Sequence, residues 1–182
     1  MFSKQFIEEL IEGIDLVSLS LVGSARRSKR TRDIDLVVIT KNEISRKKIE
    51  SKAISLGVQI FRPDVTSNTF YPLKERNNIN LKIFTLDEFR KIKHVHMDNL
   101  RIVWSLQEVN LAGKPLAELV KPSFPKSLKD KAAELKGLRR KELFWVLGTQ
   151  LLMEGTMKLE ELEDLSKDLK RGFQVLAEYG VN

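Results

Sequence analysis

The chain has 182 residues, of which 42% are hydrophobic and none is cysteine. Its 32 lysines and arginines outnumber 25 acidic residues, so the formal net charge is +7. Because the chain has no cysteine, disulfides, thiolate metal sites and cysteine nucleophiles are excluded. No apolar run is long enough to span a membrane. The basic balance favours an anionic partner, such as a nucleic acid or a nucleoside triphosphate. We expect a cytoplasmic protein with no membrane partner, and the sequence leaves its oligomeric state open.

Apolar periodicity in the first half of the chain predicts helices and strands in alternation, separated by glycine and polar turns. The expected elements are a helix near residues 6–14, strands over 16–22 and 33–40, a helix from Asn42 to Gly57, a strand over 58–61 and a polar loop over 62–78.

The second half begins with a further predicted strand, in which Ile79, Leu81 and Ile83 alternate with polar residues. Capping residues at Thr85 predict a helix after it, and an apolar stripe near residues 97–104 predicts another. Three prolines mark residues 113–127 as a linker, beyond which every apolar pattern is helical. The predicted fold class is α+β, with a mixed β-sheet flanked by helices over residues 1–115 and a C-terminal helical extension over 116–182.

One short stretch combines a turn, a run of cations and two carboxylates. Gly23 and Ser24 follow the first predicted strand, and Asp33 and Asp35 stand at the start of the second. The basic residues between them are Arg26, Arg27, Lys29, Arg30 and Arg32. Successive side chains of a strand point to opposite faces, so Asp33 and Asp35 share one face. Two such carboxylates repel each other unless a cation lies between them, which predicts a divalent metal with oxygen ligands.

Simpler interpretations exist for the same residues. An Asp-x-Asp pair also occurs on exposed strands and turns, and the five cations could form a solvated loop. A second basic segment, residues 121–141, could contact nucleic acid or be an ordinary helical surface.

The order of a strand, Gly23-Ser24, a basic turn, Asp33-Ile34-Asp35 on a strand and a later apolar strand resembles the DNA polymerase beta-like nucleotidyltransferase superfamily. The amino-acid sequence from Gly23 to Lys29 is most similar to the palm of family X polymerases and to small prokaryotic or archaeal-type members. The resemblance covers roughly residues 15–115 and implies a nucleotidyltransferase-type sheet. The resemblance does not extend to the C-terminal helices.

The resemblance also implies a reaction, in which a hydroxyl attacks the α-phosphate of a nucleoside triphosphate and pyrophosphate leaves. Asp33 and Asp35 would be the catalytic residues and the ligands of Mg²⁺, with Mn²⁺ as an alternative. Gly23 and Ser24 would bind the nucleotide phosphates together with Arg26, Arg27, Lys29, Arg30 and Arg32. The acceptor, whether DNA, RNA, protein or a small molecule, and the preferred base stay open.

One position departs from the pattern of active members. Asn80 stands where they carry a third carboxylate, and an amide is neither a general base nor a strong ligand for a hard cation. Binding of the metal that contacts the triphosphate can tolerate this change, whereas binding of the metal that activates the nucleophile should be weakened most. Asp64, Asp87 and Glu88 are the candidate replacement carboxylates, although Asp87 and Glu88 also suit the start of a helix.

Two functional hypotheses follow. The first is a metal-dependent nucleotidyltransferase that binds a nucleoside triphosphate with Mg²⁺ and transfers a nucleotidyl group to a hydroxyl acceptor. The second is a catalytically weakened or inactive member that acts as a nucleotide-binding, nucleic-acid-binding or regulatory, antitoxin-like module. Asn80 is the residue that separates the two.

Overall fold

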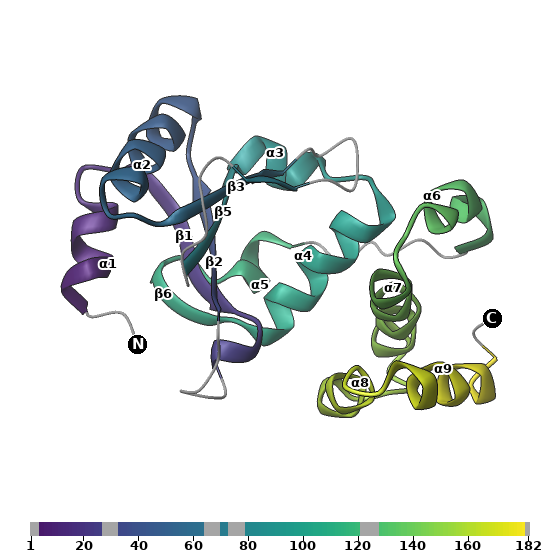
Figure 1. Ribbon diagram of the computed structural model, residues 1–182. Helices are drawn as coiled ribbons and strands as arrows, with labels where there is room; N and C mark the ends of the chain where they lie inside the picture. Colours follow the sequence, from purple (N-terminus) through teal and green to yellow (C-terminus); the bar gives the residue numbers. More distant parts are fainter. Residues whose placement is uncertain (1–3, 27–32, 64–69, 73–78, 121–127, 181–182) are drawn as a thin grey trace. The chain divides into compact units, whose positions relative to one another are not determined.

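The computed structural model describes residues 4–26, 33–63, 70–72, 79–120 and 128–180 (Figure 1). Over these residues the chain is α+β, with a mixed sheet flanked by helices and followed by further helices, which confirms the predicted fold class. It forms two compact units, Met1–Ile92 with Gln107–Lys121 and Lys93–Leu106 with Pro122–Asn182. These bounds differ from the expected division at residues 115 and 116, because one helix before that point belongs with the C-terminal helices.

The first unit is built on a six-stranded sheet in the order β4-β3-β5-β2-β1-β6. Its strands are β1 (Leu16–Val22), β2 (Ile34–Thr40), β3 (Gln59–Pro63), β4 (Phe70–Pro72), β5 (Ile79–Thr85) and β6 (Val109–Gly113). The central strands β2 and β5 are parallel, with Asp35 opposite Asn80 and Thr40 opposite Thr85. These two strands therefore start together at one end of the sheet and finish together at the other.

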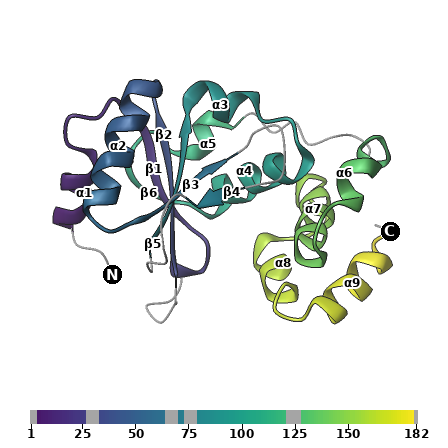
Figure 2. The same ribbon diagram turned by 45° about the horizontal axis from the view of Figure 1, so that its top comes forward.

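The two faces of this sheet are covered by different helices. Helices α1 (Lys4–Ile11) and α2 (Glu43–Ser55) lie on one face, as the two ribbon views show (Figures 1 and 2). The core on that face includes Leu10, Leu36 and Ile49, all fully buried. Because side chains alternate along a strand, Asp35 and Asn80 belong to the opposite face.

Helices α3 (Leu86–Lys91) and α5 (Leu116–Leu119) follow strands β5 and β6. The rings of Phe84 in β5 and Phe89 in α3 meet edge to face, with their centroids 5.4 Å apart. Glu108 connects α5 to β1, since its carboxylate accepts hydrogen bonds from the backbone N–H of Leu116 (2.9 Å) and from the Ser20 hydroxyl (2.7 Å). Both contacts involve the face to which Asp35 belongs.

The strands expected over residues 16–22, 33–40, 58–61 and 79–84 are confirmed with small shifts of their ends. Two regions differ from expectation. Strand β4 lies within the predicted loop, and β6 and α5 overlap the predicted linker. These elements have only three to five residues, so they are too short to show a clear hydrophobic period.

The second unit is helical. Its helices are α4 (Val95–Gln107), α6 (Ala132–Lys136), α7 (Arg140–Met153), α8 (Leu159–Leu165) and α9 (Leu169–Glu178). The Thr149 hydroxyl of α7 donates a hydrogen bond to the Asn99 side chain of α4, which joins α4 to this unit. Phe144, Leu162 and Leu176 are fully buried in its core.

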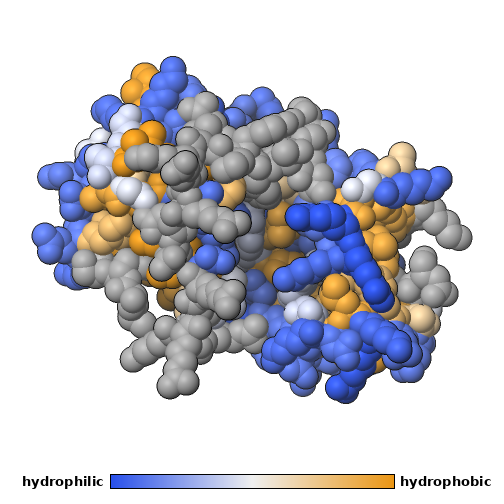
Figure 3. Space-filling model, in the orientation of Figure 1, coloured by the Kyte–Doolittle hydropathy of each residue, from blue (hydrophilic) through white to orange (hydrophobic). Residues whose placement is uncertain are grey.

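The helices of this unit approach closely at Gly172, where an added Cβ would lie 2.6 Å from Cε2 of Phe144. Figure 3 shows apolar residues among charged ones over the C-terminal helices. None of the helices in the described ranges is long and apolar enough to cross a membrane.

Candidate functional site

The candidate site begins where β1 ends. Gly23 directly follows β1 and has a positive φ of +73°, a conformation that residues with a Cβ rarely adopt. A Cβ added to Gly23 would lie 3.1 Å from the Asp35 carboxylate oxygen Oδ2. Glycine at this position therefore allows both the turn and the close approach of the backbone to Asp35.

The two predicted metal ligands lie at the start of β2. Asp33 precedes the strand and is exposed, while the Asp35 side chain is 31% exposed. Val22 and Asn80 stand opposite Asp35 on the neighbouring strands, in antiparallel and parallel pairing respectively. The register therefore brings Asp35 and Asn80 side by side.

Asn80 and Lys82 both contact the Asp35 oxygen Oδ1. The Asn80 amide nitrogen Nδ2 donates a hydrogen bond to it at 3.3 Å, and the Lys82 ammonium lies 2.6 Å away. The Lys82 side chain is only 17% exposed, and its ammonium also lies 5.9 Å from the centre of the Phe61 ring. One oxygen of the predicted metal ligand is thus occupied by a cation that the protein itself provides.

Lys82 was not among the residues that the sequence predicted for this site. The signal for it was available, because Lys82 is two residues beyond Asn80 on the same strand and so shares its face.

The structure describes only part of the predicted phosphate-binding segment. Ser24 and Arg26 lie in a short 3-10 helix, where Ser24 is exposed and Arg26 is partly buried. The other predicted phosphate ligands, Arg27, Lys29, Arg30 and Arg32, lie outside the described residues, and so does Asp64.

Asp87 and Glu88, the other candidate replacement carboxylates, follow the far end of β5 and are engaged there. Asp87 accepts a hydrogen bond from Lys91 in the same helix at 2.7 Å. Glu88 forms a capping box with Thr85, in which the Thr85 backbone N–H donates to its carboxylate at 2.8 Å. Neither carboxylate is placed to act in the position of Asn80.

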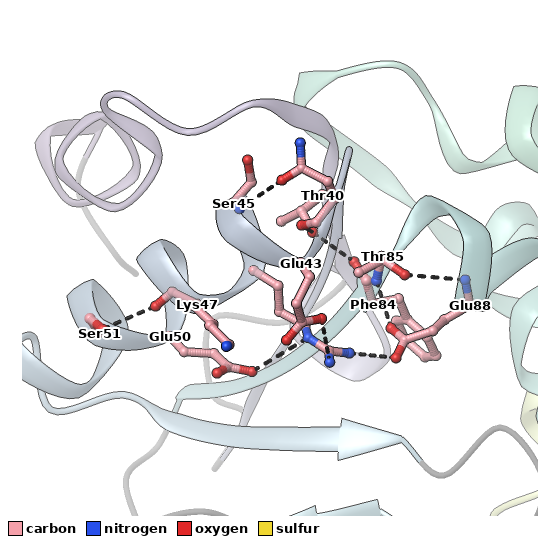
Figure 4. A network of polar contacts seen from close by, with 11 residues as sticks. Thr40, Glu43, Ser45, Lys47, Glu50, Ser51, Phe84, Thr85 and Glu88 are labelled. Atoms are coloured by element: carbon pink, nitrogen blue, oxygen red, sulfur yellow. Dashed lines mark hydrogen bonds and ion pairs between the residues drawn. The ribbon is translucent and has the colours of Figure 1, made fainter.

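The far ends of β2 and β5 carry a polar network of a different kind (Figure 4). The Thr40 hydroxyl donates to the backbone carbonyl of Phe84 at 3.3 Å. The Asn42 side chain caps α2 by accepting a hydrogen bond from the backbone N–H of Ser45 at 2.9 Å. These contacts close the strand ends and start the helices that follow.

Arg46 of α2 joins this network to α3. Its guanidinium is 2.5 Å from carboxylate oxygens of both Glu43 and Glu88, and its side chain is 13% exposed. Burial works against the charge of Arg46, but the hydrogen bonds to Glu88 and Glu43 outweigh it and raise the pKa of the guanidinium above its ordinary value. The positive charge of Arg46 is therefore paired with carboxylates of α2 and α3 at this end of the sheet.

The donor set at the candidate site fits one Mg²⁺ ion. Mg²⁺ binds through one or two carboxylates, substrate phosphates and water, which Asp33, Asp35 and a triphosphate can supply together. Within the described ranges, no three His, Cys, Asp or Glu side chains are grouped so that they could hold a metal by themselves. Asn80 presents an amide beside Asp35 where a second metal would need a further carboxylate, so the described residues do not fit a two-metal centre.

No protein-family model matches the chain, and no curated protein sequence matches it either. Among solved structures, it is similar to spectinomycin adenyltransferase AAD(9) from Enterococcus faecialis with ATP and spectinomycin, at 13% identity and a TM-score of 0.47, over 97% of this chain and 86% of that one. It is also similar to a mutant of the toxin-antitoxin MntA-HpeT (13% identity, TM-score 0.35) and to a toxin-antitoxin with AMP-PNP (14%, 0.36), over 85% of this chain and 91% of each. At these identities and TM-scores the likeness carries no argument about function, which rests on the site.

Proposed function

We propose that this chain binds a nucleoside triphosphate together with Mg²⁺ and transfers a nucleotidyl group to a hydroxyl acceptor. One observation carries the proposal. Asp35 lies at the start of a central strand, directly against the left-handed turn at Gly23 and two residues after an exposed Asp33. The proposal is supported by one carboxylate beside a turn whose backbone can approach an anionic ligand without an intervening side chain, and by a second carboxylate two residues earlier in the chain.

The proposed roles follow from these positions. Asp33 and Asp35 would hold Mg²⁺, for which Mn²⁺ could substitute, and such an ion would neutralise charge on the triphosphate and polarise the phosphoryl oxygen. Gly23 and Ser24 contact phosphate oxygens through backbone N–H groups and the Ser24 hydroxyl. The cations of the following segment, Arg26, Arg27, Lys29, Arg30 and Arg32, neutralise the remaining phosphate charge or the backbone of a nucleic-acid acceptor.

No described carboxylate takes the proton of the attacking hydroxyl in the position of Asn80. The proton therefore passes to water or to a phosphate oxygen, and we expect slow turnover. General-base catalysis typically contributes about 10²- to 10⁴-fold in rate, which sets the scale of the deficit.

A second function is favoured by the contacts of Asp35. Asn80 and Lys82 both donate to its Oδ1, an arrangement that suits a nucleotide-binding or regulatory module better than a fast enzyme. In this case the chain would bind the metal and nucleotide, or a nucleic acid, without transferring a nucleotidyl group.

Label transfer from α-³²P-labelled nucleoside triphosphates distinguishes the two functions. Each nucleotide is incubated with the chain, Mg²⁺ or Mn²⁺, and DNA, RNA, protein or small hydroxyl acceptors. If the chain is a nucleotidyltransferase, we expect labelled product that is lost in Asp33→Asn and Asp35→Asn. The product should be retained in Asp87→Asn, a matched control at the far end of β5. Labelling that appears only after Asn80→Asp would overturn the proposed transferase function and support the proposed binding function.

A further inference from the structure

The ion pair between Lys82 and Asp35 differs from the surface ion pairs of this chain. The Lys82 and Asp35 side chains are 17% and 31% exposed, whereas Lys91 and Asp87 form a pair of similar length at 69% and 72% exposure. Water screens the exposed pair, and such pairs contribute little. The Lys82 pair is more shielded, so its two charges interact more strongly.

The contact also occupies one of the two Asp35 oxygens that a metal could use. Lys82 approaches Oδ1 of Asp35 at 2.6 Å, and the Asn80 amide donates to the same oxygen. The second oxygen, Oδ2, faces the backbone at Gly23. A divalent cation that binds Oδ1 needs its lone pairs, and it would repel an ammonium held against the same oxygen.

We infer that Lys82 is the resident counter-ion of Asp35, which a divalent cation must displace when it binds. This inference rests on the proposed function, since it assumes that Asp35 is a metal ligand. In the metal-free protein Lys82 neutralises Asp35 and holds the start of β2 against β5. When the metal arrives, the triphosphate that accompanies it offers the displaced ammonium new anionic oxygens.

A lysine is compatible with a metal site at this position when an anionic ligand accompanies the metal. Metal alone must compete with Lys82 for Asp35 and brings no new anion for the displaced ammonium. Metal with a nucleotide brings a second anion, so the competition is relieved. The site is therefore expected to discriminate in favour of metal that arrives together with a triphosphate.

The test measures Mn²⁺ binding in the absence of nucleotide, by electron paramagnetic resonance of the free ion. Lys82→Met removes the charge but keeps an apolar stem near Phe61. We expect it to bind Mn²⁺ about five- to tenfold more tightly than the unmodified chain, since a neighbouring like charge is removed. Lys82→Arg and the surface control Lys91→Met should bind Mn²⁺ as the unmodified chain does.

Thermal unfolding in EDTA gives a second readout. Lys82→Met should unfold at a lower temperature than Lys91→Met, because Asp35 loses its counter-ion, and added Mn²⁺ should restore more of this loss than in the control. If Lys82→Met does not fold, Lys82→Gln carries the same expectations. Mn²⁺ affinity that is unchanged or weaker in the uncharged variant, or undetectable in it, would overturn the inference.

Binding of Mn²⁺ with AMP-PNP separates this failure from failure of the proposed function. If neither the unmodified chain nor Lys82→Met binds the pair, the proposed function fails and the inference with it. If both bind it, but Lys82→Met does so more weakly with unchanged affinity for Mn²⁺ alone, Lys82 is only a phosphate ligand. That result would leave the proposed function intact and reject the counter-ion.

Discussion

The two ends of strands β2 and β5 are both polar, but their polar groups serve different purposes. At the end where the strands finish, Thr40 and Thr85 make hydrogen bonds that close the strands and start α3, and Arg46 is balanced by Glu43 and Glu88. At the end where the strands start, Asp35 does not cap a helix. Its carboxylate lies beside the turn at Gly23 and contacts Lys82.

The difference shows how structural and functional carboxylates can be told apart in one sheet. Glu88 accepts hydrogen bonds from the backbone N–H of Thr85 and from Arg46, so removing it would leave the Thr85 N–H without its acceptor and Arg46 without one of its carboxylate partners. Asp35 satisfies no backbone group in the described residues. It follows an exposed second carboxylate, Asp33, by two residues and is paired with Lys82, an arrangement that suits a cation.

The largest predicted effect is on metal and nucleotide binding. Asp35→Asn removes a carboxylate ligand, and we expect the affinity for Mg²⁺ with a nucleoside triphosphate to fall by more than about 100-fold. Isothermal titration with a non-hydrolysable triphosphate measures this. Glu88→Gln, at the far end of the same two strands, should retain the affinity of the unmodified chain. Equal losses in the two variants would mean that the ends are not functionally distinct.

The second prediction concerns stability at the far end. Arg46→Met leaves the carboxylates of Glu43 and Glu88 without their shared cation, and we expect a loss of about 2–3 kcal/mol in the free energy of unfolding. Urea denaturation measures the loss. Nucleotide affinity measured on the folded variant should not change, and a weakened affinity would show that the network also supports the site.

A third prediction restores the missing carboxylate. Asn80→Asp places an acid opposite Asp35, where Lys82 can offset part of the repulsion between them. We expect nucleotidyl transfer with Mg²⁺ to rise by about tenfold or more, because a general base and a second metal ligand become available. Initial rates of label transfer provide the measurement, and Asn110→Asp on the edge strand β6 is the control for added charge. A rate no higher than that of the control would argue against a role for position 80.

The smallest effect is expected at the cap of α3. Thr85→Ala removes the hydroxyl that accepts a hydrogen bond from the Glu88 backbone N–H, which should cost about 1 kcal/mol in unfolding free energy. Thr85→Ser retains the hydroxyl and should recover most of that loss in the same denaturation experiment. Should both variants be equally destabilised, the methyl group rather than the cap would be what matters.

Much of the first unit could be predicted from the sequence because its helices and strands are defined by patterns among neighbouring residues. Alternation predicted β2 and β5, and capping residues predicted the start of α3 at Thr85. The approach of Asn80 to Asp35 followed from the pattern of the resembled family, and the observed register places them opposite each other.

The remaining features depend on contacts between distant segments. Arg46 meets Glu88 across 42 residues, and β6 is defined by its pairing with β1 rather than by its own composition. Lys82 could be placed on the face of Asn80, but its pairing with Asp35 required the register of two strands. Short edge strands and ion pairs of this kind leave little trace in a single sequence.

The most direct test is a crystal structure with AMP-PNP and Mn²⁺, in which the anomalous signal locates the metal. We expect one Mn²⁺ ion bound by Asp33, Asp35 and phosphate oxygens, with the Lys82 ammonium no longer in contact with Asp35 Oδ1. A fully bound nucleotide with Lys82 still on Asp35 and no Mn²⁺ beside Asp33 and Asp35 would contradict it.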